Sequence, residues 1–178
     1  PNIAYTLALL GEKPSVMGTV GQDFSDYRQW LETLGIDTRY IKVIDGEYTA
    51  SFFANTDLSN AQIASFYTGA MAHAAELSVK DITEKDDLVI VSPNDPTAMH
   101  KYVQECAEIG QAYLYDPSQQ LARIDAESIR CGVENANSLF VNDYEIGLLL
   151  KHTGFSMDDV LRFVKLLVIT RGKDGASI

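Results

Sequence analysis

The chain has 178 residues, of which 46% are hydrophobic and 22% are charged, a composition typical of globular and not of disordered proteins. Its net charge of -11 disfavours nucleic acids and anionic membrane surfaces as partners, because both are polyanions. No apolar run approaches the roughly 20 residues that a bilayer span needs. Only two cysteines, Cys106 and Cys131, occur, which favours a reducing cytoplasm over an oxidising compartment.

The N-terminal part of the chain alternates between helical and strand-like patterns. Apolar spacing predicts helices over residues 2–10 and 24–34, each followed by a glycine, Gly11 or Gly35. A short buried strand is expected between them, over residues 15–21. Alternation of this kind predicts a parallel sheet whose strands are joined by helical crossovers.

The pattern changes after residue 40. Two strand-like runs, 40–44 and 47–53, flank an Asp-Gly dipeptide at 45–46, which favours a type I′ hairpin. A polar turn at 57–60 separates them from a further extended run at 62–67. We therefore expect a small antiparallel sheet inserted in the α/β chain, over about residues 38–68. Such an insert serves as a lid or a dimer surface, or simply extends a sheet edge.

From residue 87 the alternation resumes and continues to the end of the chain. The expected strands are 88–91, 112–115, 139–141 and 166–170, and the expected helices are 96–109, a segment within 119–129, 144–150 and 157–164. No Pro/Ser-rich linker interrupts this order, so we expect one α/β domain with an insert.

Ligands of open α/β sheets bind beyond the carboxyl ends of the strands, and polar segments follow several of these strands. The first contains Gln119, Gln120 and Arg123, which could hold a polar ligand from one side. The alternative is that Asp116 or Ser118 caps a helix whose exposed face carries these side chains. Composition alone favours the capping alternative.

Two further segments follow the strands expected at 139–141 and 166–170. Asn142 and Glu145 have the spacing of a capping box, and their oxygens also suit Mg²⁺ and phosphate. Thr170, Gly172 and Gly175 offer a hydroxyl and close backbone approach to a nucleotide, although a tight turn between strands explains them equally well.

Phe52 and Phe66, both in the expected insert, could sandwich a flat base, although packing of one sheet face is the more common role of a phenylalanine. Scattered histidines and cysteines argue against a zinc site, and neither GxSxG nor GxGxxG occurs. The residues by themselves thus indicate an α/β domain with an inserted hairpin and polar loops at the strand ends.

Several of these segments together resemble the PfkB family of ribokinase-like kinases over essentially the whole chain. Residues 2–11 resemble the end of the family's GGxxxN signature, 20–23 its VGxD motif, 142–145 its NxxE motif and 170–175 its TxGxxG turn. Within the family, residues 62–71 and 116–123 are similar to those of bacterial adenosine kinases.

The resemblance implies a ribokinase-like fold and ATP- and Mg²⁺-dependent phosphoryl transfer to a primary hydroxyl, the 5′-OH if the acceptor is adenosine. It also implies that the insert is a lid and often a homodimer interface. A different sugar or nucleoside, or a catalytically silent nucleoside-binding or dimerisation module, is the alternative. The implied substrate contacts are Asn2, Phe52, Phe66, Gln119, Gln120 and Arg123; the implied nucleotide contacts are Asn142, Thr170, Gly172 and Gly175, with Glu145 in the Mg²⁺ network.

Both ends of the chain depart from a complete kinase of this kind. The chain begins at Pro1 without an initiator methionine and stops at Ile178 in mid-pattern, so we expect an incomplete domain over residues 1–178. The resemblance implies that the GAGD segment with the catalytic aspartate lies beyond Ile178. We therefore expect the chain by itself to show no useful turnover.

Overall fold

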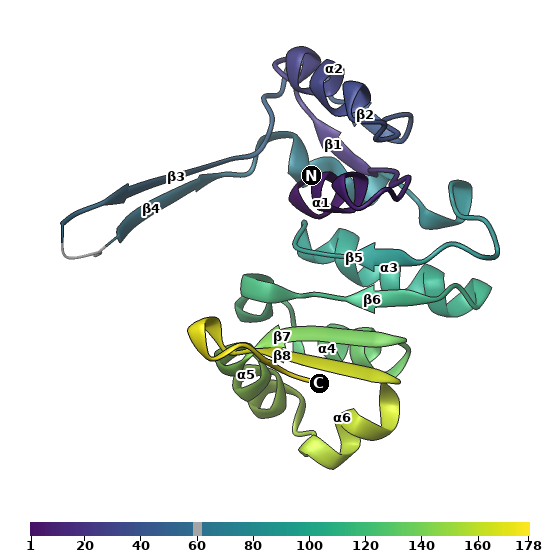
Figure 1. Cartoon of the computed structure of the whole chain (residues 1–178), viewed down its shortest axis with the longest axis vertical. Coiled ribbons are helices and arrows are strands. Elements are labelled where there is room, and N and C mark those ends of the chain that lie inside the picture. The colour runs from purple at the N-terminus through teal and green to yellow at the C-terminus, as the bar shows by residue number, and fades with distance from the viewer. Residues whose placement is uncertain (59–61) are drawn as a thin grey trace. The chain divides into compact units, whose positions relative to one another are not determined.

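The computed structural model describes residues 1–58 and 62–178, which form two compact units, Pro1–Leu77 and Ser78–Ile178 (Figure 1). Each unit has its own sheet and its own buried residues, and the two are described separately below. Within the described residues, none of the helices combines the length and the apolar character that a membrane crossing requires.

The first unit is built on two short parallel strands, β1 (Gly18–Val20) and β2 (Ile41–Val43), connected by α2 (Ser25–Thr33). The helix α1 (Asn2–Leu9) precedes them, at the positions that the apolar spacing predicts. These elements share one small core, because each contributes an apolar side chain to it. Its buried members are Ala4, Val20, Phe24, Leu31, Ile36 and Ile41.

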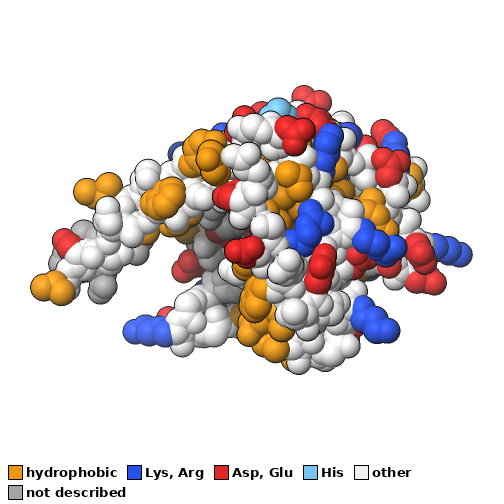
Figure 2. Space-filling model, turned by 90° about the horizontal axis from the view of Figure 1, so that it is seen from above, with side chains coloured by type: hydrophobic (Ala, Val, Ile, Leu, Met, Phe, Trp, Pro, Cys, Tyr) orange, Lys and Arg blue, Asp and Glu red, His pale blue; other side chains and the backbone are white. Residues whose placement is uncertain are grey.

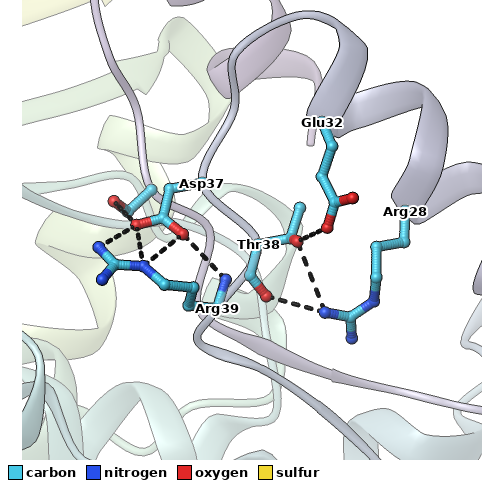
Figure 3. A network of polar contacts seen from close by, with 6 residues as sticks. Arg28, Glu32, Asp37, Thr38 and Arg39 are labelled. Atoms are coloured by element: carbon cyan, nitrogen blue, oxygen red, sulfur yellow. Dashed lines mark hydrogen bonds and ion pairs between the residues drawn. The ribbon is translucent and has the colours of Figure 1, made fainter.

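Polar contacts fix the segment between α2 and β2 (Figure 3). Arg28 of α2 donates to the carbonyl oxygens of Thr38 and Ile41, both at 3.0 Å. Glu32, one helical turn further along, accepts from the Thr38 hydroxyl. These bonds satisfy backbone groups at the start of β2, so α2 sets the position of that strand beside β1.

The hairpin predicted around residues 45–46 is wrong. Gly46 does have a positive φ of 79°, but β2 pairs in parallel with β1, and Ile44 N–H donates to the carbonyl of Val20 at 2.8 Å. The antiparallel hairpin is instead β3 (Ser51–Thr56) with β4 (Gln62–Tyr67). A turn dipeptide determines the local backbone angles only, whereas the partner of β2 is a strand more than 20 residues earlier in the chain.

The strands β3 and β4 form a two-stranded ribbon, which we call the ribbon from here on. The small inserted antiparallel sheet is thus confirmed, one strand later than expected. Residues 59–61, which include part of the turn predicted at 57–60, lie outside the described residues. After the ribbon comes the 3₁₀ helix η1 (Gly69–Glu76), which the sequence pattern did not predict. It packs against β1.

The second unit contains a five-stranded sheet in the order β5-β6-β7-β8-β9, parallel except for β9. Consecutive strand order with right-handed crossovers places the connecting helices on one face of the sheet, where α4 packs against α3, α5 and α6. Its elements are η2 (Val79–Asp81), β5 (Val89–Val91), α3 (Pro96–Ile109), β6 (Tyr113–Tyr115), η3 (Ser118–Ala122), α4 (Ala126–Glu134), β7 (Ser138–Asn142), α5 (Asp143–Thr153), α6 (Met157–Phe163), β8 (Leu166–Thr170), η4 (Gly172–Asp174) and β9 (Ala176–Ser177).

Most of these elements were predicted, and local signals explain why. Asp95 caps α3, Pro96 is its first residue and Gly110 ends it with a φ of 69°, so both ends match the prediction. The single helix predicted within 119–129 is wrong, because that stretch divides into η3 and α4. The division occurs where Asp125 caps α4 by accepting from the Ser128 N–H at 2.9 Å.

Candidate functional site

The carboxyl ends of three adjacent parallel strands bring polar residues to one edge of the sheet in the second unit. Asp116 follows β6, Asn142 is the last residue of β7 and Thr170 is the last residue of β8. Asn142 and Thr170 are register partners in the β7–β8 ladder. The edge at which open α/β sheets bind ligands therefore carries a carboxylate, an amide and a hydroxyl.

Asp116 is partly buried at this edge. Burial, followed by the nearby negative charge of Glu145, raises the pKa of the Asp116 carboxyl to about 6. Neither Asp116 nor Ser118 caps η3, whose N-cap residue is Pro117 and makes no side-chain cap bond, so the capping role considered for them is wrong. A partly buried carboxylate with a raised pKa at the carboxyl end of a sheet strand is a candidate for binding or catalysis.

Asn142 and Glu145 form a complete capping box at the start of α5. The Asn142 amide oxygen accepts from the Glu145 N–H at 2.8 Å, and the Glu145 carboxylate accepts from the Asn142 N–H at 2.8 Å. The structural interpretation of this pair is thus confirmed. The capping bond uses one carboxylate oxygen of Glu145, and α5 begins directly after β7, so the positive end of its dipole lies at this edge of the sheet, where an anion is favoured.

Residues 170–175 form the tight turn between β8 and the antiparallel β9. Arg171 N–H donates to the Gly175 carbonyl at 2.7 Å and closes the turn. Gly172 and Gly175 have φ values of 56° and 85°, and a Cβ at either position would meet nothing within 4 Å. These glycines are therefore required by backbone conformation and not by packing, and the space beside them is open to a ligand.

The segment after Asp116 is bent by an unusual backbone angle. Ser118 has a φ of 45°, the one non-glycine residue among those described with a positive φ. In η3, Gln119 is exposed and Gln120 is only 5% exposed, and the side-chain oxygen of Gln120 is buried without a hydrogen-bond partner. A buried unpaired amide oxygen beside the sheet edge suits a ligand donor. Arg123, at the end of η3, is exposed.

In the first unit, the ribbon brings Phe52 and Phe66 together. They are directly opposite each other in the β3–β4 register, so their side chains share one face. Phe53 and Ile63 lie on the other face, and all four side chains are exposed. Figure 2 shows hydrophobic side chains exposed along the ribbon, at the left. Asn2, the first residue of α1, is also exposed, and no described contact joins it to either phenylalanine.

The donor set at the sheet edge fits Mg²⁺ only in part. Asp116 and Glu145 supply two neighbouring carboxylates, but the described residues contain no group of three or more His, Cys, Asp or Glu side chains that could hold a metal ion. Mg²⁺ is commonly held by one or two carboxylates together with substrate phosphates and water, so two carboxylates are compatible with such a site only when a phosphate completes it.

From the sequence, Asp116 was considered only as a helix cap. Its position directly after a strand could be seen in the sequence, but its raised pKa could not, because that depends on burial and on Glu145, which is 29 positions later in the chain. The sequence also placed Phe52 and Phe66 in the same insert, but it did not predict the β3–β4 register that sets them opposite each other.

Comparison with known proteins places the whole chain in one group. The model of the pfkB family of carbohydrate kinases matches residues 1–178. A nucleoside kinase of Methanocaldococcus jannaschii is 29% identical over 184 residues, which cover 99% of this chain and 58% of that protein. The chain thus spans less than two thirds of the length of this relative.

Solved structures agree with the sequence comparison. The nucleoside kinase of Burkholderia thailandensis in complex with ADP-inosine has a TM-score of 0.90 and 36% identity, covering 98% of this chain and 55% of that one. Its complex with inosine gives a TM-score of 0.88 and 34% identity, over 99% of this chain and 60% of that one. The structure of the M. jannaschii nucleoside kinase is described as that of an archaeal member of the ribokinase family. It has a TM-score of 0.90 and 28% identity, covering 98% of this chain and 58% of that one.

Proposed function

The chain belongs to the pfkB family of carbohydrate kinases, and we propose that the protein is an ATP-dependent nucleoside kinase. The reaction transfers the γ-phosphoryl group of ATP to a primary hydroxyl of the nucleoside. A bond forms between the hydroxyl oxygen and the γ-phosphorus, and the bond from the γ-phosphorus to the oxygen of the ADP leaving group breaks. The hydroxyl proton passes to a base, which the family resemblance implies is the aspartate of the GAGD segment.

The observation that carries this proposal is the likeness to the B. thailandensis nucleoside kinase, at 36% identity and a TM-score of 0.90 over nearly the whole chain. That protein is described with inosine and with ADP-inosine. The geometry supports the same reaction, because the strand ends carry the oxygen-rich, glycine-containing edge that a phosphate-binding site requires.

Each residue of the sheet edge has a distinct part in the proposed reaction. The Asn142 amide and the Thr170 hydroxyl, on residues that are register partners, orient the nucleotide, and the open backbone at Gly172 and Gly175 approaches it. Asp116 and Glu145 would hold Mg²⁺, which when bound neutralises charge on the phosphates. Catalysis by these residues is positioning and charge stabilisation, which is what phosphoryl transfer chiefly needs.

The ribbon of the first unit and η3 of the second unit each carry residues to which we assign a part in nucleoside binding. Phe52 and Phe66 present two aromatic faces from one side of the ribbon, which suits a flat base. Gln120 offers the buried unpaired oxygen, while Gln119, Arg123 and Asn2 would contact the base or the ribose hydroxyls. We assign the ribbon (within residues 38–68) as the lid that excludes water, since water competes with the hydroxyl as acceptor.

Adenosine is our preferred acceptor, and inosine is the nucleoside that the similar structure contains. The test is ADP release by the whole protein with ATP and adenosine, inosine, guanosine or ribose as acceptor. We expect nucleosides to support turnover with at least a tenfold higher kcat/KM than ribose. A protein that turned over ribose and no nucleoside would contradict the proposal.

A matched pair of variants locates the base. Phe66→Ala removes an aromatic face on the proposed nucleoside side of the ribbon, whereas Asn55→Ala changes the opposite side. Loss of one base–aromatic contact is worth about 1–3 kcal/mol, so nucleoside KM should rise by about fivefold or more in Phe66→Ala. An equal effect of both variants would place the base elsewhere.

Two further assignments rest on surface and thiol chemistry. The second ribbon face, with Phe53 and Ile63 exposed at 63% and 81%, is our proposed homodimer surface, since such side chains favour burial. Light scattering should give a dimer mass that Ile63→Ser reduces to a monomer mass; an unchanged dimer would exclude this face.

Both cysteines are free thiols, which supports a cytoplasmic location.

A further inference from the structure

A side chain of the β1–α2 loop, Asp23, bonds to the segment that leads into the ribbon. Thr49, two residues before β3, is held by Asp23: one carboxylate oxygen accepts from the Thr49 N–H at 2.8 Å and from its hydroxyl at 2.7 Å. The same Thr49 hydroxyl accepts from the Gly21 N–H at 3.0 Å. Asp23 thus binds both the backbone and the side chain of Thr49, and Gly21 binds its side chain, just before the ribbon begins.

Backbone contacts hold the neighbouring residues of this attachment. Gln22 N–H donates to the Glu47 carbonyl at 3.1 Å, and Ala70 N–H donates to the Tyr48 carbonyl at 2.9 Å. The first bond joins the β1–α2 loop to the segment that leads into β3. The second joins this segment to the start of η1, which follows β4. The chain before β3 and the chain after β4 are therefore held together at Tyr48.

Two glycines make this close approach possible. A Cβ at Gly21 would lie 2.3 Å from the Tyr48 Cα, and one at Gly69 would lie 2.2 Å from the Tyr48 carbonyl oxygen, both far inside contact distance. Gly69 also has a φ of 46°. The backbone thus leaves no room for side chains at Gly21 and Gly69, where the β1–α2 loop and the chain after β4 pass close to Tyr48.

The Asp23 carboxylate is exposed, so packing of the core does not account for it. Its bonds to Thr49 lower the pKa of the Asp23 carboxyl, which keeps the acceptor ionised and the bonds charge-assisted near neutral pH. Asp23 is not a member of the first core, whereas the next residue, Phe24, is. The side-chain bonds of Asp23 to Thr49 instead direct it at the segment that leads into the ribbon.

We propose that Asp23 is a positioning residue that, through Thr49, holds the ribbon at the angle needed to present Phe52 and Phe66 to the nucleoside. The proposal rests on the function proposed above. Asp23 touches no reacting atom in this account. It determines what fraction of molecules has the ribbon in the binding-competent orientation.

This role predicts a particular kinetic signature. If loss of the bonds reduces the competent fraction, the apparent nucleoside affinity falls by that fraction while saturated enzyme is unaffected. Hydrogen bonds to a charged acceptor are strong enough to change such a population by about tenfold. Nucleoside KM should therefore rise about five- to tenfold in Asp23→Ala, with kcat changed by less than about twofold. A merely destabilised protein would instead lose active molecules, which lowers kcat and leaves KM unchanged.

The experiment compares Asp23→Ala with Asp23→Asn and Asp45→Ala. Asparagine keeps the accepting oxygen and should restore most of the wild-type KM. Asp45 is an exposed carboxylate of the turn that precedes Glu47, so Asp45→Ala makes the same charge change in the same region and should leave KM unchanged. Fluorescence of Trp30, the one tryptophan of the chain, reports whether each variant retains the folded first unit.

A second readout needs no substrate. Amide hydrogen exchange at Gln22 and Ala70, whose acceptors Glu47 and Tyr48 are not mutated, should be about tenfold faster in Asp23→Ala and near wild type in Asp23→Asn. Unchanged exchange in Asp23→Ala, or equal effects of the alanine and asparagine variants, would overturn the attachment. Faster exchange with unchanged KM in an active enzyme would overturn the positioning role. All kinetic comparisons use the whole protein, and a whole wild-type protein inactive on every nucleoside would refute the proposed function and leave the exchange result standing.

Discussion

Replacement of Asp116 by asparagine should stabilise the second unit at neutral pH, although Asp116 is a proposed binding residue. In the folded protein the pKa of its carboxyl is about 6, against an ordinary value of about 3.9. Such a carboxyl takes up a proton on folding at pH values between these two. Its contribution to the free energy of unfolding is therefore present below about pH 4 and is lost as the pH rises to about 6.

The magnitude follows from the pKa difference. About two pH units correspond to about 3 kcal/mol, and partial access of solvent to the carboxyl reduces this to an expected 1–2 kcal/mol. Asparagine has nearly the same shape and no charge. The Asp116→Asn variant and the wild type should therefore have similar unfolding free energies at pH 4, and the variant should be more stable by about 1–2 kcal/mol at pH 8.

Native-state hydrogen exchange of β6 to β8 amides in a urea series is the suitable assay, because Trp30 lies in the first unit and its fluorescence does not follow the second. Asp86→Asn, an exposed carboxylate before β5, is the matched control and should show no comparable gain. A variant less stable than the wild type at pH 8, or a difference independent of pH, would refute the reasoning.

The cause of the raised pKa can be tested separately. Glu145→Gln removes the neighbouring negative charge but keeps an oxygen that can accept from the Asn142 N–H, so the α5 cap survives. Carboxyl-carbon NMR titration should show the pKa of Asp116 falling in this variant while remaining above 3.9, because burial is the larger cause. A pKa that did not move would exclude the Glu145 contribution.

Three further substitutions test the packing and turns around the site, each followed by hydrogen exchange of the second unit. Asn142→Ala should cost about 1 kcal/mol through loss of the cap and Asn142→Asp much less; equal losses would contradict the cap. Gly132→Ala should cost about 1–3 kcal/mol because its Cβ would lie 2.6 Å from the buried Tyr115 ring. Gly147→Ala, at an exposed position of α5 with open space around it, should instead stabilise by up to about 1 kcal/mol. The same sign at both positions would refute the packing account. Gly175→Ala, at φ 85° and ψ −136°, should cost about 1–3 kcal/mol and speed exchange of the Arg171 amide; no change would show that the turn adapts.

Much of the candidate site could be predicted because its signals are local. Asn142 and Glu145 are three positions apart, and the capping box they form depends on that spacing alone. Thr170 and the two glycines after it follow directly from a strand end. The roles of Gln119, Gln120 and Arg123 differ in a way that composition did not show, since only Gln120 is buried with an unpaired oxygen.

The sequence by itself determined where the helices and most strands lie, because caps, glycines and apolar spacing act over a few residues. It also determined that polar side chains follow the strands at which ligands bind. Only the tertiary structure decided which strands pair: β2 joined β1 and not the strand beyond the Asp-Gly turn. It alone placed Phe52 opposite Phe66, raised the pKa of Asp116 and joined Asp23 to Thr49. These features depend on burial and on contacts between residues far apart in the chain, which no local pattern specifies.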